Sequence, residues 1–350
     1  MFLIVKTVFY RAVNVRASVI TMSIELFYDE DTDPALITSR RVAVLGFGAQ
    51  GRAQAQNLKD AGVPVTVGLR AESPSRPAAE AAGLAVRTPA DAVAEADIVA
   101  MLVPDEAQPQ VYRDWVAPNL HQQGVLLFAH GFNIHYRKIE PRSDLDVVMV
   151  SPNGIGEQVR AQYLAGHGVP GLVAVHQDAS GNARALAFAY AWAQGHGRAG
   201  IVESTFKEET ETDLFAEQAV LCGGLTHLIE AGFETLTDAG YAPAIAYFCC
   251  LHEVKLIADM IYQRGIAGMR ESISATAEFG DYTRGPRVIG ADTRAAMRSL
   301  LAEIQHGEFA DELSEELAAG KPEIQKGRAQ ARAALIEQVG AVLRERMRRG

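Results

Sequence analysis

The pattern of apolar and polar residues changes near residue 202. From Arg40 to Val202, short β-branched runs alternate with Ala-rich stretches of helical pattern. Such alternation is typical of a doubly wound parallel sheet with helices on its faces. After Val202 the pattern predicts long helices and carries no strand signal. We therefore predict a Rossmann-type α/β domain over residues 23–205 and an all-α domain over residues 206–350.

The first 22 residues fit neither pattern. In "MFLIVKTVFYRAVNVRASVIT" the apolar residues are interrupted by Lys6, Arg11 and Arg16, so the stretch lacks the compact apolar segment of a secretory signal. Met22 is a suitable start, because an acidic leader into the first strand follows it. We expect residues 1–22 to be an extra segment outside the fold.

Net charge indicates which kinds of partner the protein binds, and cysteine content indicates its cellular compartment. The chain carries a formal net charge of −10, whereas surfaces that bind nucleic acid or anionic membranes need clustered Lys and Arg. No run is long and apolar enough to span a bilayer. We expect a small-molecule substrate, no nucleic acid and no membrane. Three closely grouped cysteines are too few for a disulfide framework, which favours the reducing cytoplasm.

The first strand–helix unit carries a glycine-rich loop. In "VAVLGFGAQGRAQAQNLKDAG" an apolar strand runs into Gly46, Gly48 and Gly51, and a helix follows. This is G-x-G-x-x-G in a strand-to-helix context: the first glycine permits the tight turn, the second lets backbone approach a pyrophosphate, and the third lets helix and strand pack closely. The loop therefore predicts a dinucleotide site.

The end of the second predicted strand indicates which dinucleotide binds. An NAD site usually has a carboxylate there for the ribose hydroxyls, but here Arg70 is followed by Ser73 and Ser75. A guanidinium with two hydroxyls suits a 2′-phosphate, so NADPH is favoured. Glu72 in the same loop is the observation against NADPH, and a solvated loop is the alternative interpretation.

Polar residues follow two later strands, where an open α/β sheet binds its ligands. His130 comes directly after "VLLFA", and Asn153, Gly154 and Gly156 come after "VVMVSP". A histidine beside a nicotinamide is a proton donor or an orienting group. A buried structural histidine is the alternative.

Two pairs of candidate metal ligands stand four residues apart in predicted helices. Asp213 and Glu217 share a helix face with apolar neighbours, where carboxylates need a cation. Cys249 and Glu253 repeat the spacing in "YFCCLHE". Oxygen ligands favour magnesium, whereas a thiolate favours zinc, manganese or iron. The alternatives are acids that complement a helix dipole and a cysteine that is a small buried apolar side chain.

From Ile24 to about Arg346 the chain resembles the short, bacterial ketol-acid reductoisomerases. The segments that carry the resemblance include "GFGAQGRAQAQNLKDAG", "VGLRAESPS", "FAHGFNIHY", "FKEETETDLFAEQAVLCGG" and "SISATAEFGDYTRGPRVI". The resemblance implies a Rossmann domain for NADPH and a helical domain that dimerises through a figure-of-eight knot. Family members bind two Mg²⁺ ions, migrate an alkyl group in a 2-hydroxy-3-keto acid and reduce the resulting 2-keto acid, in valine, leucine and isoleucine biosynthesis.

The resemblance also implies roles for individual residues. His130 would lie in the active site, Asp213 would bridge the metal ions and Glu217 would bind one of them. Glu253 and Ser274 would come from a partner subunit to complete the metal and substrate sites, which implies a homodimer or higher homo-oligomer. The residues that would hold NADPH are Gly46, Phe47, Gly48, Ala49, Gln50, Gly51, Arg70, Ser73, Ser75 and Gly156.

Several positions depart from the family's pattern, among them Ile155, Glu157, Arg270 and Glu271, and two departures bear directly on the chemistry. Cys249 stands where the family has a glutamate that binds the second metal ion, and Asn153 stands where it has the active-site lysine. Alkyl migration needs both metal ions at once, and the lysine supplies positive charge beside the reacting oxygens. We therefore expect one Mg²⁺ site, with the second site and the roles of Cys249 and Asn153 open.

Three functions follow. The favoured one is NADPH-dependent, Mg²⁺-assisted reduction of a 2-keto acid or related carbonyl or imine, with isomerisation lost or altered. The second is a working reductoisomerase that converts 2-acetolactate to 2,3-dihydroxy-3-methylbutanoate. The third is a catalytically silent NADPH-binding protein, against which the intact Asp213, Glu217 and Glu253 argue.

Overall fold

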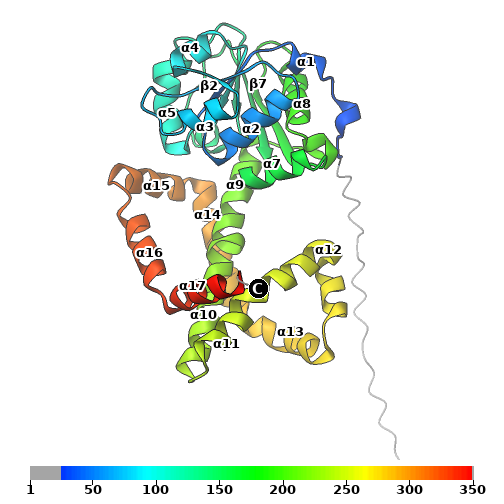
Figure 1. Cartoon of the computed structure of the whole chain (residues 1–350), viewed down its shortest axis with the longest axis vertical. Helices are drawn as coiled ribbons and strands as arrows, with labels where there is room; N and C mark the ends of the chain where they lie inside the picture. The colour runs from blue at the N-terminus through cyan, green and yellow to red at the C-terminus, as the bar shows by residue number, and fades with distance from the viewer. Residues whose placement is uncertain (1–24, 349–350) are drawn as a thin grey trace, which may run out of the picture.

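The computed structural model describes residues 25–348, which form an α/β region followed by a helical region (Figure 1). The predicted extra segment, residues 1–22, lies outside the described residues. The last strand ends at Glu203, and from Phe206 onward the chain is helical. No helix in the described part of the chain is both long and apolar enough to cross a membrane.

One eight-stranded sheet forms the α/β region, with strand order β3-β2-β1-β4-β5-β6-β7-β8. All neighbouring strands are parallel except β6 and β7, which are antiparallel. The α/β fold is thus confirmed, although β7 and β8 run against the other strands, a direction that periodicity does not encode. The strands are β1 (Val42–Leu45), β2 (Val65–Gly68), β3 (Ala85–Arg87), β4 (Ile98–Met101), β5 (Val125–Phe128), β6 (Asp146–Pro152), β7 (Gly171–Gln177) and β8 (Ile201–Glu203).

Helices cover both faces of this sheet. Val42 and Val44 of β1 pack into one apolar core, whereas Ala43 and Leu45 pack into a second core on the opposite face. Because both faces are buried, the strand is a continuous apolar run rather than an alternating one. The helices are α1 (Ala35–Thr38), α2 (Ala49–Asp60), α3 (Arg76–Ala81), α4 (Pro89–Ala94), α5 (Gln108–Val111), α6 (Phe132–His135), α7 (Gly156–Leu164) and α8 (Ala183–Ala193).

His196, in the short turn after α8, makes the stability of this region sensitive to acid. The side chain is fully buried, with Nδ1 2.8 Å from the Val169 carbonyl oxygen. Burial lowers the pKa of His196 to about 4. Above pH ~6.5 His196 is neutral in the folded and in the unfolded protein. Below pH ~6.5 the unfolded chain binds a proton at this residue while the folded protein does not. We expect the unfolding free energy to fall by about 2 kcal/mol between pH 7 and pH 5 through this residue.

Urea unfolding at pH 7 and pH 5 tests this prediction. The comparison variant is His196→Asn, whose amide can still donate to the Val169 carbonyl but does not titrate. Between pH 7 and pH 5 the unfolding free energy of the variant is expected to fall by about 2 kcal/mol less than that of the wild type, whatever the absolute stability of the variant. Equal pH dependence in both proteins would show that His196 is not the acid-sensitive group.

The helical region contains two π-helical turns, η5 (Glu217–Leu221) and η6 (Phe248–His252). The sequence pattern predicts continuous α-helices through both segments. A π turn inserts an extra residue into a helix and is frequent at functional sites. The remaining helices are α9 (Phe206–Ala216), α10 (Gly223–Asp238), α11 (Pro243–Tyr247), α12 (Val254–Ser272), α13 (Ala275–Val288), α14 (Ala291–His306), α15 (Glu308–Ala318), α16 (Pro322–Ala333) and α17 (Leu335–Met347).

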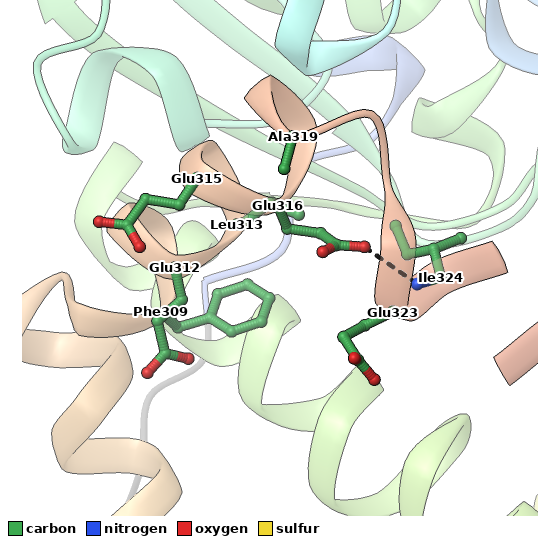
Figure 2. Close-up of a pocket in the computed structure, with 8 residues that line it drawn as sticks. All are labelled: Phe309, Glu312, Leu313, Glu315, Glu316, Ala319, Glu323 and Ile324. Carbon is green, nitrogen blue, oxygen red and sulfur yellow. Dashed lines mark hydrogen bonds between the residues drawn. The ribbon is translucent and has the colours of Figure 1, made fainter. Parts of the chain in front are cut away.

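The later helices form two open frames instead of a packed bundle (Figure 1). One frame contains α12 and α13, and the other contains α14, α15, α16 and α17. Large apolar side chains are exposed on the first frame, with Tyr262 at 91% exposure. A groove of about 690 Å³ runs between α15 and α16, where Phe309, Leu313 and Ile324 lie among four glutamates (Figure 2).

Candidate active site

The glycine-rich loop joins β1 to α2 with little space to spare. Gly46 has a left-handed backbone (φ +100°), and a Cβ there would lie 2.6 Å from the Leu102 carbonyl oxygen. A Cβ on Gly51 would lie 2.4 Å from the Gly46 carbonyl oxygen, whereas one on Gly48 would meet nothing within 4 Å. The backbone at Gly48 is therefore open to a ligand, as the fingerprint predicts.

A cleft of about 730 Å³ lies between this loop, the ends of β4, β5 and β6, and the helix α9. It brings together several predicted residues that are far apart in sequence. Among the residues that line it are Gly46, Phe47, Gly48, Ala49, Gln50, Asp105, His130, Asn153, Glu209, Asp213 and Glu217.

His130 follows β5 and faces the carboxylates of α9. Its Nδ1 atom lies 3.0 Å from Glu209 Oε1 and 3.6 Å from Asp213 Oδ2. Burial by itself lowers the pKa of His130, but the hydrogen bond and charge of Glu209, together with Asp105 and Asp213, outweigh burial and raise the pKa to about 9. At neutral pH the imidazole is therefore a cation held inside the cleft.

Glu209 is the site residue that the sequence reasoning missed. Its side chain is 3% exposed, and its carboxylate accepts hydrogen bonds from Ser151 Oγ at 2.8 Å and from the Gly131 amide at 2.9 Å, besides contacting His130. With Thr210 Oγ1 at 3.4 Å, both carboxylate oxygens are engaged twice. Hydrogen bonds to both oxygens therefore hold Glu209 in place beside His130.

Carboxylates outnumber cations in the cleft. Burial raises the pKa of Asp213, and the neighbouring Glu209 and Asp105 raise it further, against the opposing effect of His130. Burial and then Asp213 raise the pKa of Glu217 in the same way. The Asp213 side chain is 49% exposed and open to a ligand. A divalent cation between Asp213 and Glu217 would relieve this repulsion, so the donor set fits Mg²⁺.

The predicted 2′-phosphate residues lie outside the cleft, in the loop after β2. The Ser73 amide donates to the Arg70 carbonyl at 3.1 Å, and the Arg76 amide donates to the Ser73 carbonyl at 3.1 Å. Arg70 is exposed, and Ser73 and Ser75 are partly exposed. A dinucleotide that starts at the glycine-rich loop can reach them with its adenosine end.

Three other predicted residues lie apart from the cleft within one chain. Cys249 and Glu253 are exposed on and after η6, and all three cysteines are free thiols. Ser274 caps α13, because its Oγ accepts a hydrogen bond from the Ala277 amide at 3.2 Å. None of the three residues lines the cleft described above.

Two family models cover most of the chain. Residues 36–200 match "Acetohydroxy acid isomeroreductase, NADPH-binding domain", and residues 206–349 match "Ketol-acid reductoisomerase, C-terminal domain". The chain belongs to the ketol-acid reductoisomerase family. A member of this family is a pyridine-nucleotide-dependent oxidoreductase, and the glycine-rich loop lies within the residues that match its NADPH-binding domain.

Solved structures agree with the family assignment. An NADH-preferring ketol-acid reductoisomerase from an uncultured archean is 43% identical, with a TM-score of 0.89, over 92% of this chain and 99% of that chain. Two others share only the fold at 16% identity. A semialdehyde dehydrogenase NAD-binding protein from Cupriavidus necator has a TM-score of 0.59 over 76% of this chain and 99% of that chain. An oxidoreductase from Jannaschia sp. CCS1 has a TM-score of 0.57 over 76% and 97%.

Proposed function

We propose that this member of the ketol-acid reductoisomerase family uses NADPH and Mg²⁺ to reduce a 2-keto acid or a related carbonyl or imine, and that its alkyl-migration step is lost or altered. The observation that carries the proposal is the composition of the cleft. His130 contacts Glu209 and Asp213 there and Glu217 lines the same cleft, whereas Asn153 supplies no positive charge. Reduction depends on the histidine and the carboxylates. Alkyl migration also depends on the positive charge of the family's lysine, which Asn153 replaces.

His130 is the proton donor in this proposal. Reduction of a carbonyl adds a hydride to carbon and a proton to oxygen, so the cleft needs an acid beside the reacting oxygen. Glu209 keeps His130 protonated up to about pH 9. Asp213 and Glu217 would hold the metal ion, and a bound Mg²⁺ polarises a carbonyl oxygen as a Lewis acid.

The residues of the loop after β2 are the reason for proposing NADPH as the cofactor. Arg70, Ser73 and Ser75 offer a guanidinium and two hydroxyls at the end of the second strand, and Glu72 is the carboxylate of that loop. The 43% identical structure belongs to an NADH-preferring enzyme, so the preference has to be measured on this protein. Dissociation constants for NADPH and NADH, compared directly, decide it.

The two open frames are the reason for proposing a homodimer or higher homo-oligomer. Large apolar side chains are exposed on α12 and α13, and apolar residues also line the groove between α15 and α16 (Figure 2). Contiguous exposed apolar surface marks sites of protein–protein contact. A second copy threaded through these frames, as in a figure-of-eight knot, would cover them. It would also bring its own Glu253, Ser274 and Cys249 to the cleft, completing a site for the small-molecule substrate.

NADPH oxidation by the purified protein with Mg²⁺ tests the proposal, with 2-acetolactate compared with its rearranged product, 3-hydroxy-3-methyl-2-oxobutanoate. We expect turnover of the rearranged acid and little or none of 2-acetolactate. Equal turnover of both would support the alternative, a working reductoisomerase in branched-chain amino-acid biosynthesis. If neither is used and a panel of other 2-keto acids, carbonyls and imines also fails, the silent NADPH-binding protein replaces the proposal.

A further inference from the structure

Two amide side chains, the half-buried Gln50 and the fully buried Gln54, connect the core to the turn that carries Asn153. Gln50, the second residue of α2, donates from Nε2 to the Gly154 carbonyl oxygen at 3.0 Å. Beside this bond, a Cβ on Gly156 would lie 2.2 Å from the Ala49 carbonyl oxygen. The turn between β6 and α7 is therefore pressed against the loop and fixed there by one side-chain hydrogen bond.

The hydrogen bonds continue into the core. Gln54 is fully buried and donates from Nε2 to Gln50 Oε1 at 3.2 Å. Tyr190 of α8 is also fully buried, and its hydroxyl donates to Gln54 Oε1 at 2.8 Å. Three hydrogen bonds in series thus run from Tyr190 to the carbonyl of Gly154.

All three bonds run from donor to acceptor in the same direction, from Tyr190 toward Gly154. A glutamine amide presents an acceptor on one side and a donor on the other, so fixing one side fixes the other. The Gly154 carbonyl oxygen can only accept, so Gln50 turns its NH₂ toward Gly154 and its oxygen toward Gln54. Gln54 then turns its NH₂ toward Gln50 and its oxygen toward Tyr190, whose hydroxyl donates to it. Without the hydroxyl, the buried Gln54 oxygen loses this donor, so Gln54 holds Gln50, and through it the Gly154 carbonyl, less firmly.

We propose that Tyr190, Gln54 and Gln50 form a positioning relay that holds the Asn153–Ile155 turn against the glycine-rich loop in the arrangement that binds the dinucleotide. Tyr190 is a positioning residue in this relay, since its hydroxyl lies in the core and acts through the two glutamines. The inference depends only on dinucleotide binding and is independent of the substrate and of the isomerisation step.

Calorimetric titration with NADPH and NADH tests the relay on the full-length protein. Tyr190→Phe removes only the hydroxyl, and we expect it to weaken binding of the preferred dinucleotide about fivefold. The matched control is Tyr112→Phe, because the buried Tyr112 hydroxyl accepts a hydrogen bond from the Arg142 amide at 2.8 Å on the other face of the sheet. The control is expected to lower the melting temperature without changing the dissociation constant.

A double-mutant cycle separates the relay from a general loss of stability. Gln50→Met removes the last donor, so Tyr190→Phe is expected to have no further effect on dinucleotide affinity in that background. Additive effects would overturn the relay, as would an unchanged dissociation constant in Tyr190→Phe. If Tyr190→Phe does not fold, Gln54→Met replaces it in the cycle with the same expectation.

Discussion

Replacing Glu209 with glutamine is expected to reduce the turnover number for reduction on the order of a hundredfold. The substitution keeps the size of the side chain but removes the charge that raises the pKa of His130. The pKa of His130 should fall, because burial then acts with less opposition. The alkaline limb of the rate profile, which we expect near pH 9 in the wild type, should move to lower pH. The histidine titration, followed by NMR, checks the cause independently of activity.

The same ion pair predicts how stability depends on pH. The pKa of His130 is about 9 in the folded protein, above the ordinary value of 6.5. The stabilisation by Glu209 is therefore fully present below about pH 6.5 and is lost as pH rises through about 9. In Glu209→Gln this alkaline loss should be smaller, and the Gly131 amide loses a carboxylate acceptor at all pH values.

Glu208→Gln is the matched control. Glu208 lies next to Glu209 on α9 but is exposed, and its carboxylate accepts a hydrogen bond from Ser204 Oγ at 3.2 Å. The control makes the same chemical change on the same helix and should leave both the rate and the His130 titration unchanged. If Glu209→Gln behaved like Glu208→Gln, Glu209 would not control the protonation of His130.

Local sequence patterns predicted the parts of this site that depend on neighbouring residues in the chain. The glycine-rich loop is one example, since a strand, three glycines and a helix occur within one short segment. Glu209 was missed because its importance comes from Ser151 in β6 and the Gly131 amide between β5 and α6, both far from it in sequence. A signal was present, because Glu209, Asp213 and Glu217 follow one another at four-residue intervals.

The ligand pairs show a second limit of sequence patterns. Regular helix spacing placed Asp213 with Glu217 and Cys249 with Glu253, but Glu217 begins one π turn and Cys249 lies in another. A π turn depends on backbone hydrogen bonds rather than on apolar periodicity, so the residue pattern alone does not reveal it.

Introducing the family's lysine at Asn153 and its glutamate at Cys249 is expected to raise the rate of alkyl migration on the order of a hundredfold. Asn153→Lys places an ammonium group in the cleft, where carboxylates are in excess. Cys249→Glu supplies an oxygen ligand for a second metal ion from the proposed partner subunit. Because migration needs both the charge and the second ion, each single variant should gain much less than the double variant.

Product formation from 2-acetolactate measures the gain, while reduction of the rearranged keto acid should change little. The control pairs Glu157→Lys with Cys222→Glu, which introduce the same residue types at exposed positions outside the residues that line the cleft. A double variant that migrates no faster than the wild type would mean that these two residues did not cost the enzyme its isomerase step. A wild type that already migrates as fast as it reduces would show that a cysteine and an asparagine suffice at these positions, and the working reductoisomerase would stand.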